Sequence, residues 1–340
     1  TQDQAQKAGD HPMQADILAD KAVHQVDSFS LPTGWDIGPV NLFLIFGEKL
    51  TLVDTGHRSW EQFNLALRQK GLTLNDIQQI VITHHHTDHV GLLERILAAH
   101  PVPVYGHPNA APYLSREPSF LAWHREFLDT FYRQLGIPDD LLKAFWRKWE
   151  ERKEAQEAVP LSGVLKEGEP IPGLEDWIAI ETKGHAQSHI ALYRKPDQVL
   201  ISGDHIFQHT PSNAFLEPPI IPQTPRQPHL IQYREHLKKV GQLPVQIVLP
   251  GHGPAIDDLS ALVEDRLQII ERQVEKVKRL LSRNQPKTAF QLMTELYPSM
   301  YRDHLPLAVS EVVGRLDVLI ERQEVAEEIR QGIRYYRLLG

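Results

Sequence analysis

The architecture of this chain follows from one segment, Ile80-Val81-Ile82-Thr83-His84-His85-His86-Thr87-Asp88-His89. Its first residues are β-branched and apolar, which is typical of a buried strand. A strand that ends in such a cluster brings four potential metal ligands to one edge of a sheet: His84, His86, Asp88 and His89. Imidazole and carboxylate ligands without sulfur suit zinc, iron or manganese. The alternative is a hydrated, histidine-rich turn.

The composition bounds the fold and excludes several classes of site. The chain has 340 residues, enough for one large domain and a small one. Its formal net charge of -8 gives no indication of binding to nucleic acid or to anionic membranes. It has no cysteine, which excludes disulfides, thiolate nucleophiles and Cys-ligated zinc.

The N-terminal segment and the hydropathy pattern bear on localisation. Residues 1–21 are polar and rich in glutamine, without the apolar core of a signal peptide. We expect them to form a flexible lead-in. No apolar run approaches the roughly 20 residues that span a bilayer. Together these features predict a cytoplasmic protein.

Strands and helices alternate along the chain, which predicts an α/β fold with layered sheets and helices. Apolar runs predict strands over residues 41–46, 50–53, 80–82, 177–180, 190–193, 198–201 and 246–249, and helical periodicity predicts helices over residues 60–70 and about 92–99. Residues 206–229 contain repeated prolines, and so long a loop is usually functional or flexible.

Two further parts complete the predicted organisation. Residues from about 108 to 165 carry aromatic side chains at helical intervals on both sides of Pro138 and predict a helical insertion, which either packs on the domain or forms a lid over a cleft. The C-terminal part predicts helices over residues 259–283, 288–296 and 308–322 and a short β pair near Val325 and residues 333–336. That order suggests a winged-helix module. The expected division is therefore a lead-in over residues 1–21, a main domain over 22–258 and a C-terminal module over 259–340.

Each of three later strands is followed by another potential ligand. These are His185 in Gly184-His185, Asp204 in Ser202-Gly203-Asp204, and His252 in Gly251-His252-Gly253. Adjacent glycines allow sharp turns and close approach to an ion. A single histidine after a strand is usually an ordinary surface residue, but three such loops beside the first cluster favour a metal site.

The set as a whole resembles the metallo-β-lactamase superfamily, whose fold packs two β-sheets between outer helices (αββα). The family signature His-x-His-x-Asp-His is matched by His84, His86, Asp88 and His89, and its later ligands by His185, Asp204 and His252. Its early Asp-Thr-Gly element is matched by Asp54-Thr55-Gly56. The resemblance covers roughly residues 25–258 and does not explain the insertion.

The resemblance implies two divalent metal ions, with zinc expected and iron or manganese as alternatives. One ion would be held by His84, His86 and His185. The other would be held by Asp88, His89 and His252, with Asp204 bridging. A hydroxide between the metals would then attack the substrate, and Asp88 would orient it or relay its proton. Asp54 would orient a ligand from outside the set, or alternatively serve as a helix N-cap or a turn residue.

Other histidines are expected to lie outside the ligand set. We expect His85 to point away, because it alternates with two ligands along an extended segment. His189 and His205 are expected to be structural neighbours of the site. His107, in Tyr105-Gly106-His107-Pro108, is a weaker candidate for lining the cleft.

The ligand pattern favours hydrolysis of a small ester, thioester or related acyl substrate, as in glyoxalase II-like relatives. Di-iron redox relatives carry Glu where this chain has His86. Lactonase relatives often carry Tyr where it has Phe207, which weakens a lactonase assignment. A phosphodiesterase or ribonuclease is the main alternative, although acidic residues slightly outnumber basic ones after Pro286. A catalytically inert binding protein and a homodimer also stay open.

Overall fold

The computed structural model describes residues 25–152 and 158–340, so the predicted lead-in over residues 1–21 lies outside the described residues. Within them, one sheet has the order β1 (Val26–Leu31), β2 (Val40–Phe46), β3 (Leu50–Val53), β4 (Gln79–Val81), β5 (Val104–Gly106) and β6 (Gly163–Val164). The first three strands pair antiparallel, and β3 to β6 pair parallel.

A second sheet in the described part has the order β11 (Ile247–Pro250), β10 (Val199–Gly203), β9 (Ile190–Arg194), β8 (Leu174–Glu181) and β7 (Pro170–Ile171). In this second sheet, β10 and β11 pair parallel, and the other strand pairs among the described residues are antiparallel. Every residue of β9, β10 and β11 is buried. Burial on both faces explains why these strands are continuous apolar runs rather than alternating ones.

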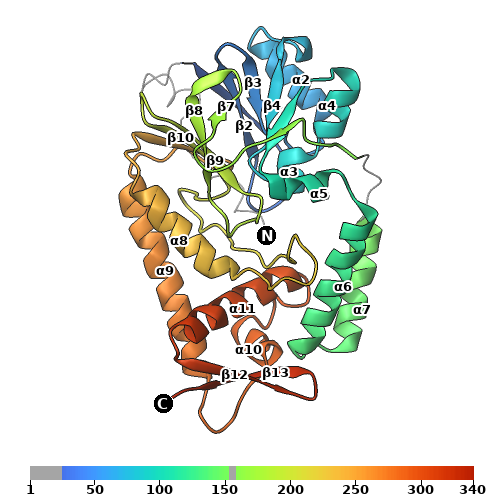
Figure 1. Ribbon diagram of the computed structural model, residues 1–340, viewed down its shortest axis with the longest axis vertical. Coiled ribbons are helices and arrows are strands. Elements are labelled where there is room, and N and C mark those ends of the chain that lie inside the picture. Colours follow the sequence, from blue (N-terminus) through green and yellow to red (C-terminus); the bar gives the residue numbers. More distant parts are fainter. Residues whose placement is uncertain (1–24, 153–157) are drawn as a thin grey trace, which may run out of the picture.

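The two sheets pack face to face, and helices cover their outer faces (Figure 1). Val53 and Val81 of the first sheet share a buried cluster with Ile201 and Leu249 of the second. The neighbouring residue Leu52 points the other way, into a cluster with the outer helices, as the period of two in a strand requires. These helices are α2 (Trp60–Gln69) and α4 (Leu93–Ala99) on the first sheet, with α8 (His229–Gly241) and α9 (Leu259–Leu280) on the second. The αββα expectation is confirmed.

The insertion is helical, as the sequence predicts. It contains η2 (Pro108–Ala110), α5 (Ala111–Leu114), α6 (Pro118–Gln134) and α7 (Asp139–Arg152), while residues 153–157 lie outside the described part. Pro138 separates the two long helices, which run side by side (Figure 1). Phe131, Tyr132 and Trp146 are buried in the cluster that also contains the C-terminal helices. The aromatic residues therefore do pack, and some also line a cavity described below.

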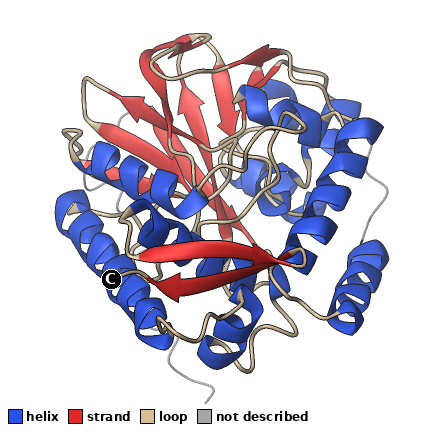
Figure 2. Cartoon of the chain, turned by 60° about the horizontal axis from the view of Figure 1, so that its bottom comes forward, coloured by secondary structure: helices blue, strands red, loops and turns tan. Residues whose placement is uncertain are grey.

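The C-terminal part contains α10 (Ala289–Leu296), α11 (Leu305–Glu321) and a hairpin of β12 (Val325–Arg330) and β13 (Ile333–Leu338) (Figure 2). Its order of two helices and a β pair is the predicted one. Val312, Leu316 and Leu319 of α11 share one buried cluster with α8, α9 and the insertion. Assignment to the winged-helix class and the boundary at residue 259 stay predictions.

One helix was not expected. Residues after the Pro-rich loop form α8, although Leu230, Tyr233, Leu237 and Val240 already have helical spacing. The elements η1 (Leu74–Asp76) and α3 (Thr87–Val90) are short turns. None of the helices in the described residues is both long and apolar enough to cross a membrane.

Candidate metal centre

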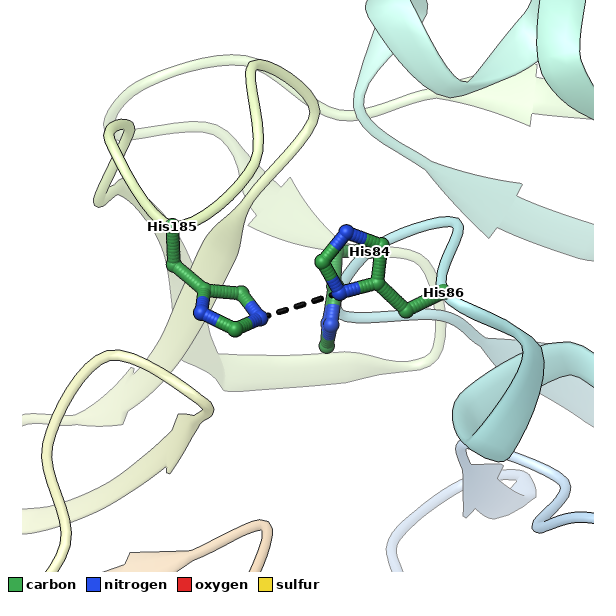
Figure 3. A group of neighbouring side chains, drawn as sticks. All are labelled: His84, His86 and His185. Carbon is green, nitrogen blue, oxygen red and sulfur yellow. Dashed lines mark hydrogen bonds between the residues drawn. The ribbon is translucent and has the colours of Figure 1, made fainter. Parts of the chain in front are cut away.

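The first ligand group forms where β4 ends. The chain continues as an extended segment that presents His84 and His86, while His185 arrives from the loop after β8 (Figure 3). The three rings point toward one another, and each offers a nitrogen within 4.8 Å of the others. His86 Nδ1 and His185 Nε2 are 3.0 Å apart. Two nitrogens bound tetrahedrally to one zinc ion at about 2.1 Å would lie roughly 3.4 Å apart, which is close to this separation.

The second group contains Asp88, His89, Asp204 and His252, again with ligand atoms within 4.8 Å. His252 Nε2 lies 3.1 Å from Asp88 Oδ2, and His89 Nε2 lies 3.1 Å from Asp204 Oδ1. The other oxygen of Asp204 is 3.6 Å from His185 Nε2 of the first group. Asp204 therefore lies between the groups, where the expected bridging carboxylate belongs.

Glycines permit this close approach. Gly203 has a φ of +49°, and a Cβ there would lie 2.8 Å from His189 Nε2. A Cβ on Gly251 would overlap Asp204 Oδ1. These contacts explain why glycine precedes both Asp204 and His252.

Hydrogen bonds outside the ligand groups fix how the imidazoles face the centre. His185 Nδ1 donates to the Asn213 carbonyl at 2.8 Å, and His252 Nδ1 donates to the Pro39 carbonyl at 2.9 Å. These bonds turn Nε2 of both rings toward the centre, and Nε2 is the nitrogen that can bind a cation in the tautomer that carries its proton on Nδ1.

Asp54 orients His89 in the same way. Its Oδ2 accepts from His89 Nδ1 at 2.8 Å, and the carboxylate also accepts from the Thr83 backbone N–H at 2.7 Å and the Thr83 hydroxyl at 2.8 Å. The N-cap of α2 is Ser59, so the helix-cap alternative for Asp54 is wrong. The contacts of Asp54 match the orienting role that the resemblance implies.

For His84, His86 and Asp88 the electrostatics favour protonation states that can bind a cation, whereas the neighbouring carboxylates raise the pKa of His89 despite its burial. Burial, with a contribution from His185, lowers the pKa of His86 to about 3, and burial also holds the pKa of His84 well below its usual value. Both imidazoles are therefore neutral at pH 7. Burial alone would raise the pKa of Asp88, but His89 and His252 outweigh it and lower that pKa, so the carboxylate is ionised.

The donor set fits bound cations. Among the described atoms, His84 Nε2 is buried without a hydrogen-bond partner, and His89 Nε2 and Asp204 Oδ1 are buried with only each other in reach, at 3.1 Å. Leaving such groups unsatisfied costs about 1–3 kcal/mol each. All three face the ligand groups, where divalent cations would satisfy them. The structure thus brings together every ligand that the sequence predicts, while their metal binding stays a prediction.

The remaining histidines have distinct positions. His189 is structural, as expected: its Nε2 accepts from the Asp204 backbone N–H at 3.0 Å and its Nδ1 contacts Thr182 Oγ1. His107 pairs with Glu181 at 3.0 Å and does not line the cavity beside the ligand groups, so its suggested place in that cleft is wrong.

His205, the other expected structural neighbour, is buried beside Tyr233, whose hydroxyl donates to the His205 carbonyl at 2.8 Å.

His85 lies outside the two predicted ligand groups, as expected, but the expectation that it points away from the site is wrong. Its ring lines the cavity, stacks on Tyr113 at 3.6 Å and lies 3.5 Å from Glu217 Oε1. The chain turns at α3 immediately afterwards, so simple strand alternation does not hold here.

Glu217 itself was not predicted. Burial raises its pKa to about 8, although the Gln187 backbone N–H donates to it. It comes from the Pro-rich loop, in which no spacing motif marks it.

A cavity of about 610 Å³ opens on the ligand groups. Asp88, His185, Asp204 and His252 lie in its wall. Much of the remaining wall is apolar and comes from the insertion, the Pro-rich loop and nearby segments: Leu114, Leu121, Leu128, Tyr132, Phe145, Trp149, Val159, Phe215 and Leu216. A substrate with an apolar part would therefore be held directly beside the ligands.

Comparisons with known proteins agree with this geometry. Residues 35–252 match the Metallo-beta-lactamase superfamily. The probable metallo-hydrolase YqjP of Bacillus subtilis (strain 168) is 35% identical over 315 residues, covering 92% of this chain and 97% of that protein. A hydroxyacylglutathione hydrolase of Alkalilimnicola ehrlichii is 54% identical over 91 residues, which cover 26% of this chain and 33% of the relative. The crystal structure of the metallo-beta-lactamase family protein TTHA1429 from Thermus thermophilus has a TM-score of 0.73 at 25% identity, with 93% of this chain and 99% of that chain covered.

Proposed function

The chain belongs to the metallo-β-lactamase superfamily and is a metal-dependent hydrolase, and we propose that it cleaves ester or thioester bonds of small acyl compounds. The observation that carries this proposal is the apolar cavity of about 610 Å³ that opens on both ligand groups. Two divalent cations, with zinc expected, would activate water and polarise the acyl carbonyl when bound there.

The side chains have separate tasks in this proposal. His84, His86 and His185 would hold one cation, and Asp88, His89 and His252 the other, with Asp204 shared. Asp88 faces the cavity as an ionised carboxylate, so it can accept the proton that the attacking water loses. The apolar wall excludes bulk water from the acyl group and holds its carbonyl near the ligands.

Phosphoryl transfer is the second candidate, because two-metal sites also serve phosphodiesterases. The cavity wall argues against a polynucleotide: beside the ligand groups it is largely apolar, and outside those groups its charged side chains are Glu94, Glu217 and Arg116. Phosphate-backbone binding needs a continuous basic surface. A small acyl substrate fits this wall better.

A substrate screen tests the proposal. The metal-loaded protein is assayed on p-nitrophenyl acetate, S-lactoylglutathione, an acyl-homoserine lactone and bis-p-nitrophenyl phosphate. We expect turnover of the ester or thioester at least about 100-fold above the metal-free protein, as for removal of a catalytic group. Faster turnover of the phosphodiester than of every acyl compound would contradict the acyl assignment.

Asp88 provides the matched test of mechanism. Asp88→Ala should lower kcat by about 10²–10⁴-fold, because ligand and proton acceptor are lost together. Asp88→Asn keeps an oxygen that can bind the metal but removes the carboxylate that accepts the proton. Measuring metal content and kcat together therefore separates metal binding from proton acceptance. The control is Asp176→Ala, an exposed position of β8, which should keep full turnover. A fully active Asp88→Ala variant would refute the proposed task of Asp88.

A further inference from the structure

The first part of the Pro-rich loop, residues 207–216, lies directly behind two candidate ligands. The Ser212 hydroxyl donates to the backbone carbonyl of Asp204. The Asn213 carbonyl accepts from His185 Nδ1 at 2.8 Å. These ten residues, called the 207–216 segment below, contain no helix or strand. Because no ladder of backbone hydrogen bonds fixes the segment, its path depends on contacts with other parts of the chain.

Two aromatic rings of the 207–216 segment also contact candidate ligands. The Phe207 ring packs edge-on against the His252 ring, with the centroids 5.6 Å apart. The Phe215 ring packs edge-on against the His185 ring, with the centroids 5.5 Å apart. A displacement of the segment would therefore disturb several ligands at once, although the segment supplies none of them.

Helix α9 holds the start of this segment through a buried arginine. Arg266 is only 6% exposed, and its Nη2 donates to the carbonyl of Phe207 at 3.0 Å and to that of Gln208 at 2.9 Å. Its Nη1 pairs with Asp265. An arginine is seldom buried unless its guanidinium has partners, and here two consecutive backbone carbonyls are among them. The guanidinium thus fixes both carbonyls.

Helix α11 holds the other end of the segment. The hydroxyl of Ser310, which is 2% exposed, accepts from the Leu216 backbone N–H at 2.9 Å. The same hydroxyl donates to the Pro306 carbonyl at 2.6 Å, one turn earlier in the helix. Leu216 is buried, so its N–H would lose its partner if this hydroxyl were removed.

Ser310 is itself held firmly, because α11 lies directly against α8. A Cβ on Gly314, one turn further along α11, would lie 2.7 Å from the Leu230 side chain and 2.9 Å from His229 Nε2. That nitrogen donates to the Ser310 carbonyl at 2.9 Å. The two helices run below the sheets, where α11 crosses the end of α8 (Figure 1). Ser310 therefore offers the loop a fixed point.

We propose that Arg266 and Ser310 are positioning residues of the metal centre, which hold the 207–216 segment where it orients His185 and Asp204 for binding cations. Helices α9 and α11 thus act on ligands to which neither helix contributes a side chain. The inference rests on the metal binding within the proposed function, but not on which bond the protein cleaves.

Zinc affinity is the first test. Arg266→Met keeps the apolar stem but removes the donors to both carbonyls, and Ser310→Ala removes the partner of the Leu216 N–H. We expect each variant to bind at least one zinc ion about tenfold more weakly, because loss of a group behind a metal ligand typically has this effect. Competition with a chromogenic chelator measures the affinities.

Two controls separate positioning from general damage. Arg272→Met makes the same change as Arg266→Met at an exposed position of α9. Leu319→Ala destabilises α11 at a fully buried position nine residues beyond Ser310, about 13 Å along the helix. Both controls should keep wild-type zinc affinity. If Arg266→Met and Ser310→Ala bind zinc as tightly as Leu319→Ala does, the proposal is overturned.

The tautomer of His185 is the second test, and it needs no metal. Its bond to the Asn213 carbonyl requires the proton on Nδ1. Long-range ¹H–¹⁵N NMR of the metal-free, histidine-labelled protein shows which nitrogen carries the proton, and His185→Asn assigns the signal. We expect the Nδ1–H tautomer in the wild type and in Leu319→Ala, and a mixture of tautomers in Ser310→Ala. A wild-type protein with the proton on Nε2, or an unchanged tautomer in Ser310→Ala, would contradict the proposal.

The two tests keep this inference distinguishable from the proposed function. A protein that binds zinc but cleaves no ester or thioester would refute the acyl assignment, while a weaker affinity in both variants would still support the positioning residues. Ester or thioester turnover with equal zinc affinity in wild type, Arg266→Met and Ser310→Ala would do the reverse.

Discussion

At the scale of single residues, the candidate centre depends on the groups behind the ligands. Carbonyl or carboxylate oxygens accept from the Nδ1 atoms of His185, His252 and His89, so each Nε2 faces the centre. Most of these acceptors belong to segments distant in sequence, such as Pro39 and Asn213. Only the fold brings them to the site.

Asp54 gives the sharpest residue-scale prediction. Asp54→Asn replaces one acceptor oxygen by an NH₂ group, which would face the donors of Thr83 and His89. We expect metal affinity or kcat to fall about 10–100-fold, because a misaligned imidazole binds its cation poorly. Competition with a chromogenic chelator measures the affinity.

The control for this change is Asp27→Asn, which removes a half-exposed carboxylate paired with Lys70. It should leave metal affinity unchanged. Wild-type affinity and turnover in Asp54→Asn would show that the hydrogen bond to His89 is dispensable.

Sequence patterns predicted the ligands because each follows a strand and lies in a short motif. His84, Asp204 and His252 are recognisable only as parts of the whole set of motifs, because a single histidine after a strand is usually an ordinary surface residue. Glu217 was not predicted and the orientation of His85 was predicted wrongly, because both depend on how the Pro-rich loop and Tyr113 fold over the site. Contacts between distant segments leave no local pattern in the sequence.

At the scale of elements, α8 and α11 meet through His229, which is fully buried and donates from Nε2 to the Ser310 carbonyl at 2.9 Å. Burial, with Arg226 nearby, lowers the pKa of His229 to about 3. The unfolded chain therefore binds a proton near pH 6.5, whereas the folded chain does not. This contribution to stability is complete above pH 6.5 and is lost as the pH falls toward 3.

His229→Gln tests this pH dependence, because glutamine can still donate to the Ser310 carbonyl but does not titrate. Between pH 7.5 and 5.0 the wild type should lose about 2 kcal/mol of unfolding free energy relative to the variant. Urea titrations of both proteins at the two pH values measure the difference. A constant difference would mean that His229 is protonated in the folded state as well.

Helix α11 gives a packing prediction with an internal control. Leu319 is fully buried, whereas the next residue, Ile320, is 36% exposed. Leu319→Ala should lower the free energy of unfolding by about 2–5 kcal/mol, and Ile320→Ala by much less. Equal losses in urea titrations would contradict the packing of α11 against α8 and α9.

Strand and helix positions were largely predictable from apolar periodicity, as β9, β10 and α9 illustrate. The pairing of strands was not, because β3 pairs with β4 and β10 with β11 across intervening helices. The buried cluster around α11 likewise joins segments whose sequences give no sign of their contact.

At the scale of the whole molecule, the candidate ligands come from both sheets. His84, His86, Asp88 and His89 follow β4 of the first sheet, and His185, Asp204 and His252 follow strands of the second. Bound cations would therefore join the two sheets. A cation that binds only the folded state stabilises that state by about 4 kcal/mol when the cation concentration is 1,000 times its Kd.

Chelation tests this coupling. Removing bound metal should lower the melting temperature by several degrees, and zinc should restore it. Elemental analysis of the purified protein should give about two metal ions per chain. No bound metal and an unchanged melting temperature after chelation would refute the metal centre.

The candidate ligands and the cavity wall come from different segments of the chain, and this has an evolutionary consequence. The candidate ligands come from loops at strand ends, whereas much of the apolar wall of the adjoining cavity comes from the insertion and the Pro-rich loop. Substitutions in these outer segments can change which compound is accepted while the reaction chemistry is inherited intact. Relatives that share every ligand can therefore differ in their metabolic task.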